Sequence, residues 1–124
     1  MELHIDIEVQ GAILLVTANG NAAFDAALRL YKLVFDTAKE KGVNKILVNT
    51  LAVSGTITTY ERYHLGAELA AYLKQHKMNP RLAIVGIPPT TDGFAVLVAQ
   101  NRDVTTQAFD TNQAALNWLN FWPS

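Results

Sequence analysis

Residues 45–66, KILVNTLAVSGTITTYERYHLG, decide how the chain folds, because they contain a strand, a loop and a helix in succession. Residues 45–49 are rich in Ile, Leu and Val, which is typical of a strand that is buried on both faces. The hydroxyl-rich residues 50–58 follow as a loop. Thr58 and Glu61 then match a capping box, in which the two residues satisfy each other's backbone donors. A helix is therefore expected to begin immediately after Thr58.

Strands and helices alternate on both sides of this stretch. Residues 3–9 alternate apolar and polar side chains, the period of a strand with one buried face, whereas residues 12–16 are continuously apolar. The short gap at Gln10-Gly11 favours a hairpin, so these two strands are expected to be antiparallel. Apolar residues at helical spacing, with capping residues and helix-breaking residues around them, predict a helix from Asn21 to Gly42 and an end of the second helix at Asn79-Pro80. Two more strands are expected at residues 82–87 and 104–109, with a helix around Phe94 to Val98 between them. A last helix is expected from Asp110 or Thr111 to Trp122.

The element order is therefore β-β-α-β-α-β-α-β-α. Strands joined through a helix need a crossover connection, so they are expected to be parallel, with right-handed crossovers. We predict an α/β fold with a mixed five-stranded sheet and helices packed on it. A chain of 124 residues without a linker or a low-complexity segment fits a single domain over residues 1–124.

The composition excludes several classes of function. The chain carries 10 Lys and Arg against 11 Asp and Glu, a net charge of −1, whereas nonspecific nucleic-acid binding needs clustered cations. It has no cysteine, which excludes thiolate chemistry and Cys-ligated metals, and its histidines lack the helical spacing of a zinc site. The start of the chain lacks a secretory signal, and its apolar runs fall short of the roughly 18 residues of a membrane-spanning helix. We therefore expect a soluble, cytoplasmic protein with no membrane span, no nucleic-acid partner, no metal and no cofactor.

Five stretches of the chain are shared in character with a known group of proteins: ILVNTLAVSG (46–55), TYERYHLG (59–66), PPTTDGF (88–94), AQNR (99–102) and AALNWL (114–119). Together they resemble the small bacterial SpoIIAA-like proteins, single domains that are related to STAS domains. The resemblance extends over nearly the whole chain. It implies the SpoIIAA fold, a leading hairpin followed by repeated αβ units, and a function in which the domain binds protein partners or small ligands.

One position departs from this resemblance. In the STAS domains of the anti-sigma pathway, phosphorylation occurs on a Ser that follows an Asp just before a helix. Here the third strand is expected to end in Asn49, where an Asp is usual, and residues 50–58 contain no Asp-Ser pair. These residues therefore argue against a kinase-driven anti-sigma role.

The loop before the second helix is the first candidate site. In open α/β sheets, ligands favour the crevice beyond the carboxyl ends of the strands, and the unpaired amides of a helix N-terminus attract anions. Ser54, Thr56 and Thr58 are therefore candidates to bind a phosphate or carboxylate, or to accept a phosphoryl group. The alternative is that these hydroxyls only cap the helix and form the turn, which needs no ligand.

A second loop is expected to reach the same edge of the sheet. Thr90, Thr91 and Asp92 follow the fourth strand, and they would complete a pocket if the third and fourth strands are neighbours. The alternative is a rigid turn in which Thr91 or Asp92 caps the next helix. Arg62 lies in the first turn of the second helix, where the helix dipole disfavours a cation. We therefore expect an anionic partner for Arg62, either Asp92 or a ligand.

These residues leave three functions open. The leading hypothesis is a nonenzymatic binding or regulatory module of the SpoIIAA-like kind, which acts on a protein partner through the two loops. The second is a carrier or sensor of a small apolar or anionic metabolite held between the helices and the sheet. The third is an enzyme that uses Glu61 and His64, three places apart on one helix. Since no nucleophile accompanies this pair, we assign no catalytic residue.

Six aromatic residues are candidates for a pocket lining or for the surface of a homodimer, because aromatic side chains are enriched at both. The alternative for all of them is packing in the core. The apolar end of the chain, residues 119–124, is expected either to dock on its own domain or to join another subunit. The six residues are Tyr60, Tyr63, Tyr72, Trp118, Phe121 and Trp122.

Overall fold

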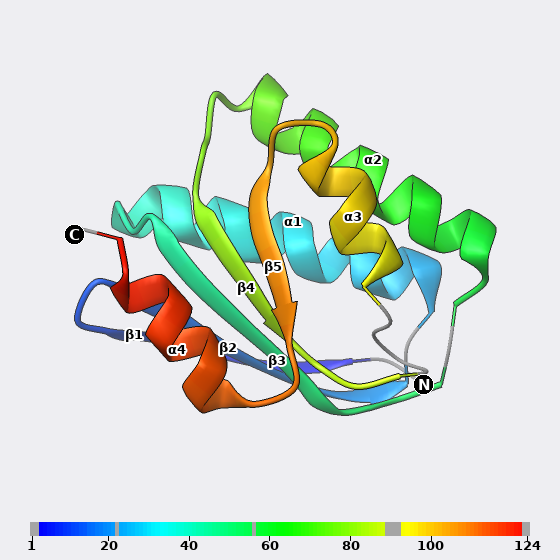
Figure 1. Ribbon diagram of the computed structural model, residues 1–124, viewed down its shortest axis with the longest axis horizontal. Helices are drawn as coiled ribbons and strands as arrows, with labels where there is room; N and C mark the ends of the chain where they lie inside the picture. The colour runs from blue at the N-terminus through cyan, green and yellow to red at the C-terminus, as the bar shows by residue number, and fades with distance from the viewer. Residues whose placement is uncertain (1–2, 22, 56, 89–92, 123–124) are drawn as a thin grey trace.

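Figure 1 shows the fold as a computed structural model, which describes residues 3–21, 23–55, 57–88 and 93–122. Its elements follow the predicted order, so the prediction of β-β-α-β-α-β-α-β-α is confirmed. They are β1 (His4–Gln10), β2 (Ile13–Asn21), α1 (Phe24–Lys41), β3 (Lys45–Ser54), α2 (Thr59–Gln75), β4 (Arg81–Val85), α3 (Phe94–Gln100), β5 (Thr105–Phe109) and α4 (Asn112–Asn120).

The five strands form one mixed sheet in the order β1-β2-β3-β4-β5. β1 and β2 form an antiparallel pair, and each later pair of neighbours is parallel, as predicted. Because each helical crossover moves one strand in the same direction with the same hand, α1, α2 and α3 lie together on one face of the sheet. α2 packs between α1 and α3, whereas α4 packs on β3, β4 and β5 from the other face (Figure 1).

Alternation of side chains along the strands divides the core into two parts. The larger part lies between the sheet and α1–α3, and its buried strand residues include Leu14, Val16, Ile46, Val48, Leu82 and Ile84. The smaller part lies under α4, where the buried residues are Leu47, Ala83, Val85, Ala115 and Leu119.

β2 and β3 continue further than their apolar runs indicate. β3 extends to Ser54 instead of ending at Asn49, so most of the predicted loop belongs to the strand. β2 also extends to Asn21, which therefore does not cap α1; the N-cap is Ala23, which makes no side-chain capping bond. The reason is mutual pairing. After a one-residue shift of register between Thr17 and Asn19, the ends of β2 and β3 go on pairing beyond the last residue of β4, and Asn21 lies opposite Ser54.

The helix ends are only partly as predicted. α1 ends at Gly42, which has a left-handed φ of 67° and allows the chain to reverse. α2 ends at Gln75, before the predicted stop at Asn79-Pro80, because Lys77 takes a φ of 55° and the chain turns there. Thr111 caps α4 as predicted, its Oγ1 accepting a hydrogen bond from the backbone N–H of Ala114 at 3.2 Å.

The segment after α4 docks on the sheet through Trp122. The buried side chain of Lys45 donates from Nζ to the backbone carbonyl of Trp122 at 2.5 Å. The guanidinium of Arg81 lies 4.7 Å from the centre of the Trp122 ring, in a cation–π contact. Phe121 points away and is 81% exposed. Of the two alternatives for this segment, docking on its own sheet is therefore the one seen for Trp122.

Candidate functional site

The carboxyl ends of β3 and β4 and the first turns of α2 form the edge that the sequence singles out. Ser54 is the last residue of β3, and its hydroxyl donates to Asn21 Oδ1 at 2.8 Å and contacts the carbonyl of Gly20 at 3.2 Å. Ser54 therefore ties β3 to the end of β2. Thr56, Thr90, Thr91 and Asp92 lie outside the residues that the structure describes.

Thr58 forms the capping box that the sequence predicts. Its Oγ1 accepts from the backbone N–H of Glu61 at 3.1 Å, and Glu61 Oε1 accepts from the backbone N–H of Thr58 at 2.8 Å. These contacts satisfy two donors at the start of α2 without a ligand. For Ser54 and Thr58, the structure therefore supplies the structural roles that were the alternative to anion binding.

The cap gives a first testable expectation. Replacing Thr58 by Ala removes the acceptor for the Glu61 amide, and we expect a loss of about 1 kcal/mol in the free energy of unfolding, measured with urea. Thr59→Ala is the matched control, because Thr59 is the first residue inside the helix and is also exposed. That control should change stability by less than about 0.5 kcal/mol. Equal losses in the two variants would contradict the capping role.

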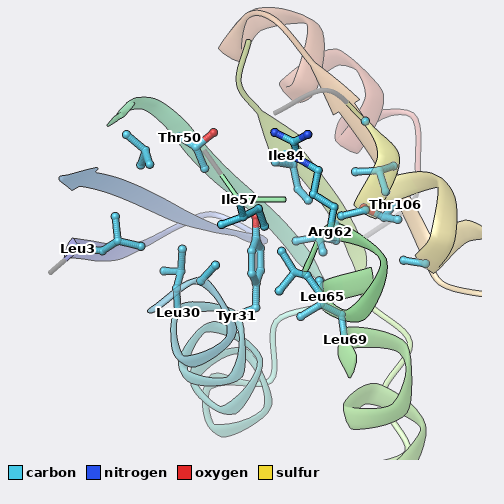
Figure 2. Close-up of a pocket in the computed structure, with 17 residues that line it drawn as sticks. Leu3, Leu30, Tyr31, Thr50, Ile57, Arg62, Leu65, Leu69, Ile84 and Thr106 are labelled. Atoms are coloured by element: carbon cyan, nitrogen blue, oxygen red, sulfur yellow. The ribbon is translucent and has the colours of Figure 1, made fainter. Parts of the chain in front are cut away.

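A cavity of about 90 Å³ lies between the sheet and the helices α1, α2 and α3 (Figure 2). Its walls are mostly leucine, isoleucine, valine and alanine side chains, which come from all three helices, from β3 and β4, and from Leu3 and Ile57. Arg62, half-buried on α2, also lines it. The structure thus places Arg62 at the wall of a cavity.

Hydroxyl groups complete the polar part of the lining. In Figure 2 the ring of Tyr31 rises from α1 with its hydroxyl toward Ile57. Burial holds the pKa of Tyr31 well above its usual range, so the hydroxyl stays protonated. Thr50 Oγ1 donates to the carbonyl of Val85 at 2.8 Å. Thr106 Oγ1 is buried and has no hydrogen-bond partner among the described residues.

Sequence reasoning missed Tyr31 and Thr106 as site residues. Tyr31 falls on the apolar stripe of α1, a position that indicates core packing, and the residue is indeed only 5% exposed. Thr106 offers a weak signal, because it lies between Val104 and Ala108 on the inward phase of a strand, where an apolar residue is expected. Only the tertiary packing shows that both residues border a cavity.

Exposed aromatic side chains cover the first turns of α2. Tyr60 is 72% exposed and Tyr63 is 42% exposed. The His64 ring packs edge-on to both, with ring centres 4.3 Å from Tyr60 and 5.5 Å from Tyr63. Arg102, after α3, donates from Nη2 to the Tyr63 hydroxyl at 3.0 Å and lies over its ring. We call Tyr60, Tyr63, His64 and Arg102 the α2 aromatic surface.

The other aromatic candidates have different places. Tyr72 packs beside Phe35 and donates from its hydroxyl to the carboxylate of Asp36, which raises the pKa of Tyr72. Trp118 packs against Phe109 and Trp122. Core packing therefore accounts for Tyr72 and Trp118.

Glu61 and His64, the pair considered for an enzyme, make structural contacts. Glu61 uses its carboxylate in the capping box, and His64 packs between two tyrosine rings. Within the described residues, no group of three or more His, Asp or Glu side chains is placed to hold a metal ion. The helices of that same part of the chain include none long and apolar enough to cross a membrane.

Asn49 occupies the position where the resemblance leads one to expect an Asp. Its Nδ2 donates to Asn112 Oδ1 at 3.0 Å, and its Oδ1 accepts from the backbone N–H of Leu51 at 2.8 Å. In this arrangement Asn49 uses both its amide donor and its amide acceptor. Asn49 therefore links β3 to the first turn of α4.

Comparison with known proteins gives matches among solved structures only. Neither the protein-family models nor the curated proteins contain a match. An anti-sigma factor antagonist from Mycobacterium paratuberculosis superposes with a TM-score of 0.67 at 15% identity, covering 96% of this chain and 95% of its own. An uncharacterized protein of the DUF3478 family from Shewanella loihica, with a SpoIIAA-like fold, superposes with a TM-score of 0.56 at 17% identity. This match covers 95% of this chain and 93% of the other.

SpoIIAA itself, in its unphosphorylated form, is also similar. It gives a TM-score of 0.56 at 13% identity and covers 98% of this chain and 100% of its own. At these identities the likeness concerns the fold. The chain therefore has the SpoIIAA-like α/β fold, and the resemblance noted in the sequence is confirmed at that level.

Proposed function

We propose that this chain is a nonenzymatic, cytoplasmic regulatory module that recognises a protein partner through the α2 aromatic surface. The observation that carries the proposal is the exposure of Tyr60 and Tyr63 on consecutive turns of a helix whose other face is packed in the core. A large, exposed aromatic side chain is costly to leave in water, and tyrosine is enriched at the centres of protein interfaces.

Rigidity is a second reason to favour this surface. Arg102 holds Tyr63 by a hydrogen bond and by stacking, and His64 contacts both tyrosine rings. Side chains that are already ordered lose little conformational entropy when a partner binds. Arginine beside tyrosine also gives a partner both an apolar contact and hydrogen-bond donors.

The fold agrees with this kind of action. The anti-sigma factor antagonist from Mycobacterium paratuberculosis and the anti-sigma factor antagonist SpoIIAA both have this fold. A phosphorylation switch is not part of the proposal, because residues 50–58 contain no Asp-Ser pair and the hydroxyls of Ser54 and Thr58 have structural hydrogen bonds.

Photo-crosslinking in cells of the source organism tests the proposal. A benzophenone amino acid at Tyr60 is expected to give one discrete adduct, whereas the same probe at Leu33, 46% exposed on α1, is the matched control and should give none. An adduct of twice the chain mass would identify a second copy as the partner.

The recovered partner then allows a quantitative measurement. Tyr60→Ala and Tyr63→Ala should each weaken its binding by at least tenfold, as expected for residues at the centre of an interface. Leu33→Ala should leave the affinity unchanged. Crosslinks of equal yield at Tyr60 and Leu33, or full affinity in both tyrosine variants, would refute the assignment of this surface.

A further inference from the structure

The cavity between the sheet and α1–α3 combines an apolar lining with a few polar groups, which is typical of a small-molecule site. We propose that it binds a short aliphatic carboxylic acid, with the carbon chain among the leucines and the acid group at Arg62 and the cavity hydroxyls. This ligand site lies under α2 and is separate from the exposed tyrosines proposed to bind a protein.

Volume limits the size of the ligand. The cavity measures about 90 Å³. An apolar cavity of about 150 Å³ holds benzene, and drug-sized ligands occupy roughly 300–1,000 Å³. The enclosed part of the ligand is therefore a chain of a few carbon atoms, and a whole nucleotide or sterol is too large.

Thr106 indicates that the ligand carries a hydrogen-bonding group. Its side chain is 4% exposed, and its Oγ1 has no hydrogen-bond partner in the described part of the chain. Its backbone carbonyl, by contrast, accepts from Gln100 Nε2 at 2.7 Å. A buried hydroxyl without a hydrogen-bond partner destabilises a fold. An oxygen atom of the ligand would accept the hydrogen bond that the Thr106 hydroxyl can donate.

Arg62 determines the charge of that group. In Figure 2 its side chain extends from α2 toward the strands near Ile84, so a positive charge borders the apolar space. A guanidinium has five N–H donors in one plane, and two of them can bind the two oxygens of a carboxylate. Enough donors are present for this even when another group already accepts a hydrogen bond from Arg62. The Tyr31 hydroxyl, directed into the same space, adds a neutral donor.

The lining also orients the ligand. Arg62, Ile84 and Thr106 border the side formed by α2, β4 and β5, whereas Leu3 and Leu30 border the side formed by the N-terminal segment and α1. The acid group therefore faces β4 and β5, and the carbon chain is directed toward α1.

Titration with the sodium salts of the straight-chain acids from acetate to octanoate tests this site, with binding followed by NMR chemical shifts of the full-length protein. Affinity should rise about fourfold with each methylene, the increment for burying one CH₂ group, and should stop rising once the cavity is full. The primary amide of the best acid should bind at least tenfold more weakly, because it lacks the charge that pairs with Arg62.

Two variants and their controls locate the site. Thr106→Val keeps the shape of the side chain and removes the hydroxyl, and Arg62→Gln removes the charge; each should weaken binding of the best acid about tenfold. Thr105→Val is the control for the first, because Thr105 precedes Thr106 on β5 and does not line the cavity, and Arg29→Gln on the exposed face of α1 is the control for the second. Both controls should bind as the unmodified protein does.

Thr106→Val is also expected to fold at least as stably as the unmodified protein, since it removes a buried, unpartnered hydroxyl. Loss of binding in that variant therefore cannot be attributed to misfolding. The absence of chemical-shift changes with any of the acids at millimolar concentration would overturn the proposal. Equal affinity for acid and amide, or unchanged affinity in both Thr106→Val and Arg62→Gln, would overturn it as well.

Discussion

Phe35→Ala is expected to lower the free energy of unfolding by about 4 kcal/mol, a large fraction of the stability of a chain of this size. Phe35 is completely buried on α1, in the larger part of the core. Its ring stands beside those of Tyr31 and Tyr72, with each pair of ring centres 6.4 Å apart. Truncation removes the largest fully buried side chain and leaves a void that the two tyrosines can fill only in part.

Urea denaturation followed by circular dichroism measures this loss. Leu33→Ala is the matched control on the same helix, because Leu33 is 46% exposed and the change creates no internal void. We expect the control to lose less than about 1 kcal/mol. A loss below about 2 kcal/mol for Phe35→Ala would mean that α1 packs more loosely on the sheet than the structure indicates.

The α1 helix illustrates how much of the fold follows from local sequence. The stripe that contains Tyr31, Phe35 and Ala38 recurs with helical period, and Gly42 supplies the left-handed turn at its end. These signals are local, so the element order and the parallel crossovers could be predicted. The ends of β2 and β3 could not, because residues as polar as Asn21 and Ser54 become strand only through pairing with each other.

In the candidate site, too, local features could be predicted from the sequence and tertiary features could not. The capping box of Thr58 and Glu61 is a relation between near neighbours, and the sequence predicts it correctly. The cavity depends on the distance between α1, α2, α3 and the sheet, which no local pattern encodes. Four predicted site residues lie outside the described structure, so their role stays a prediction: Thr56, Thr90, Thr91 and Asp92.

For the substitution Gly66→Ala, helix propensity predicts a gain in stability, whereas the packing of the helices predicts a loss. Gly66 lies in the middle of α2, where replacing Gly by Ala ordinarily stabilises a helix by about 1 kcal/mol. In this fold α3 crosses α2 at Gly66, and an added methyl carbon would lie 2.5 Å from the carbonyl oxygen of Ala95 and 2.8 Å from Cβ of Val98. Neither group is the free end of a flexible side chain, so α3 would have to move away from α2.

We therefore expect Gly66→Ala to destabilise the protein by about 3 kcal/mol, at the upper end of the usual range for overpacking. Ala71→Gly, at an exposed site on α2, measures the helix propensity alone and should cost about 1 kcal/mol. Because Ala95 lines the cavity, displacement of α3 should also weaken binding of the best acid, while Ala71→Gly should not. A Gly66→Ala variant more stable than the unmodified protein would show that α3 is not held against α2, and both the cavity wall and the Arg102–Tyr63 contact would then need to be reconsidered.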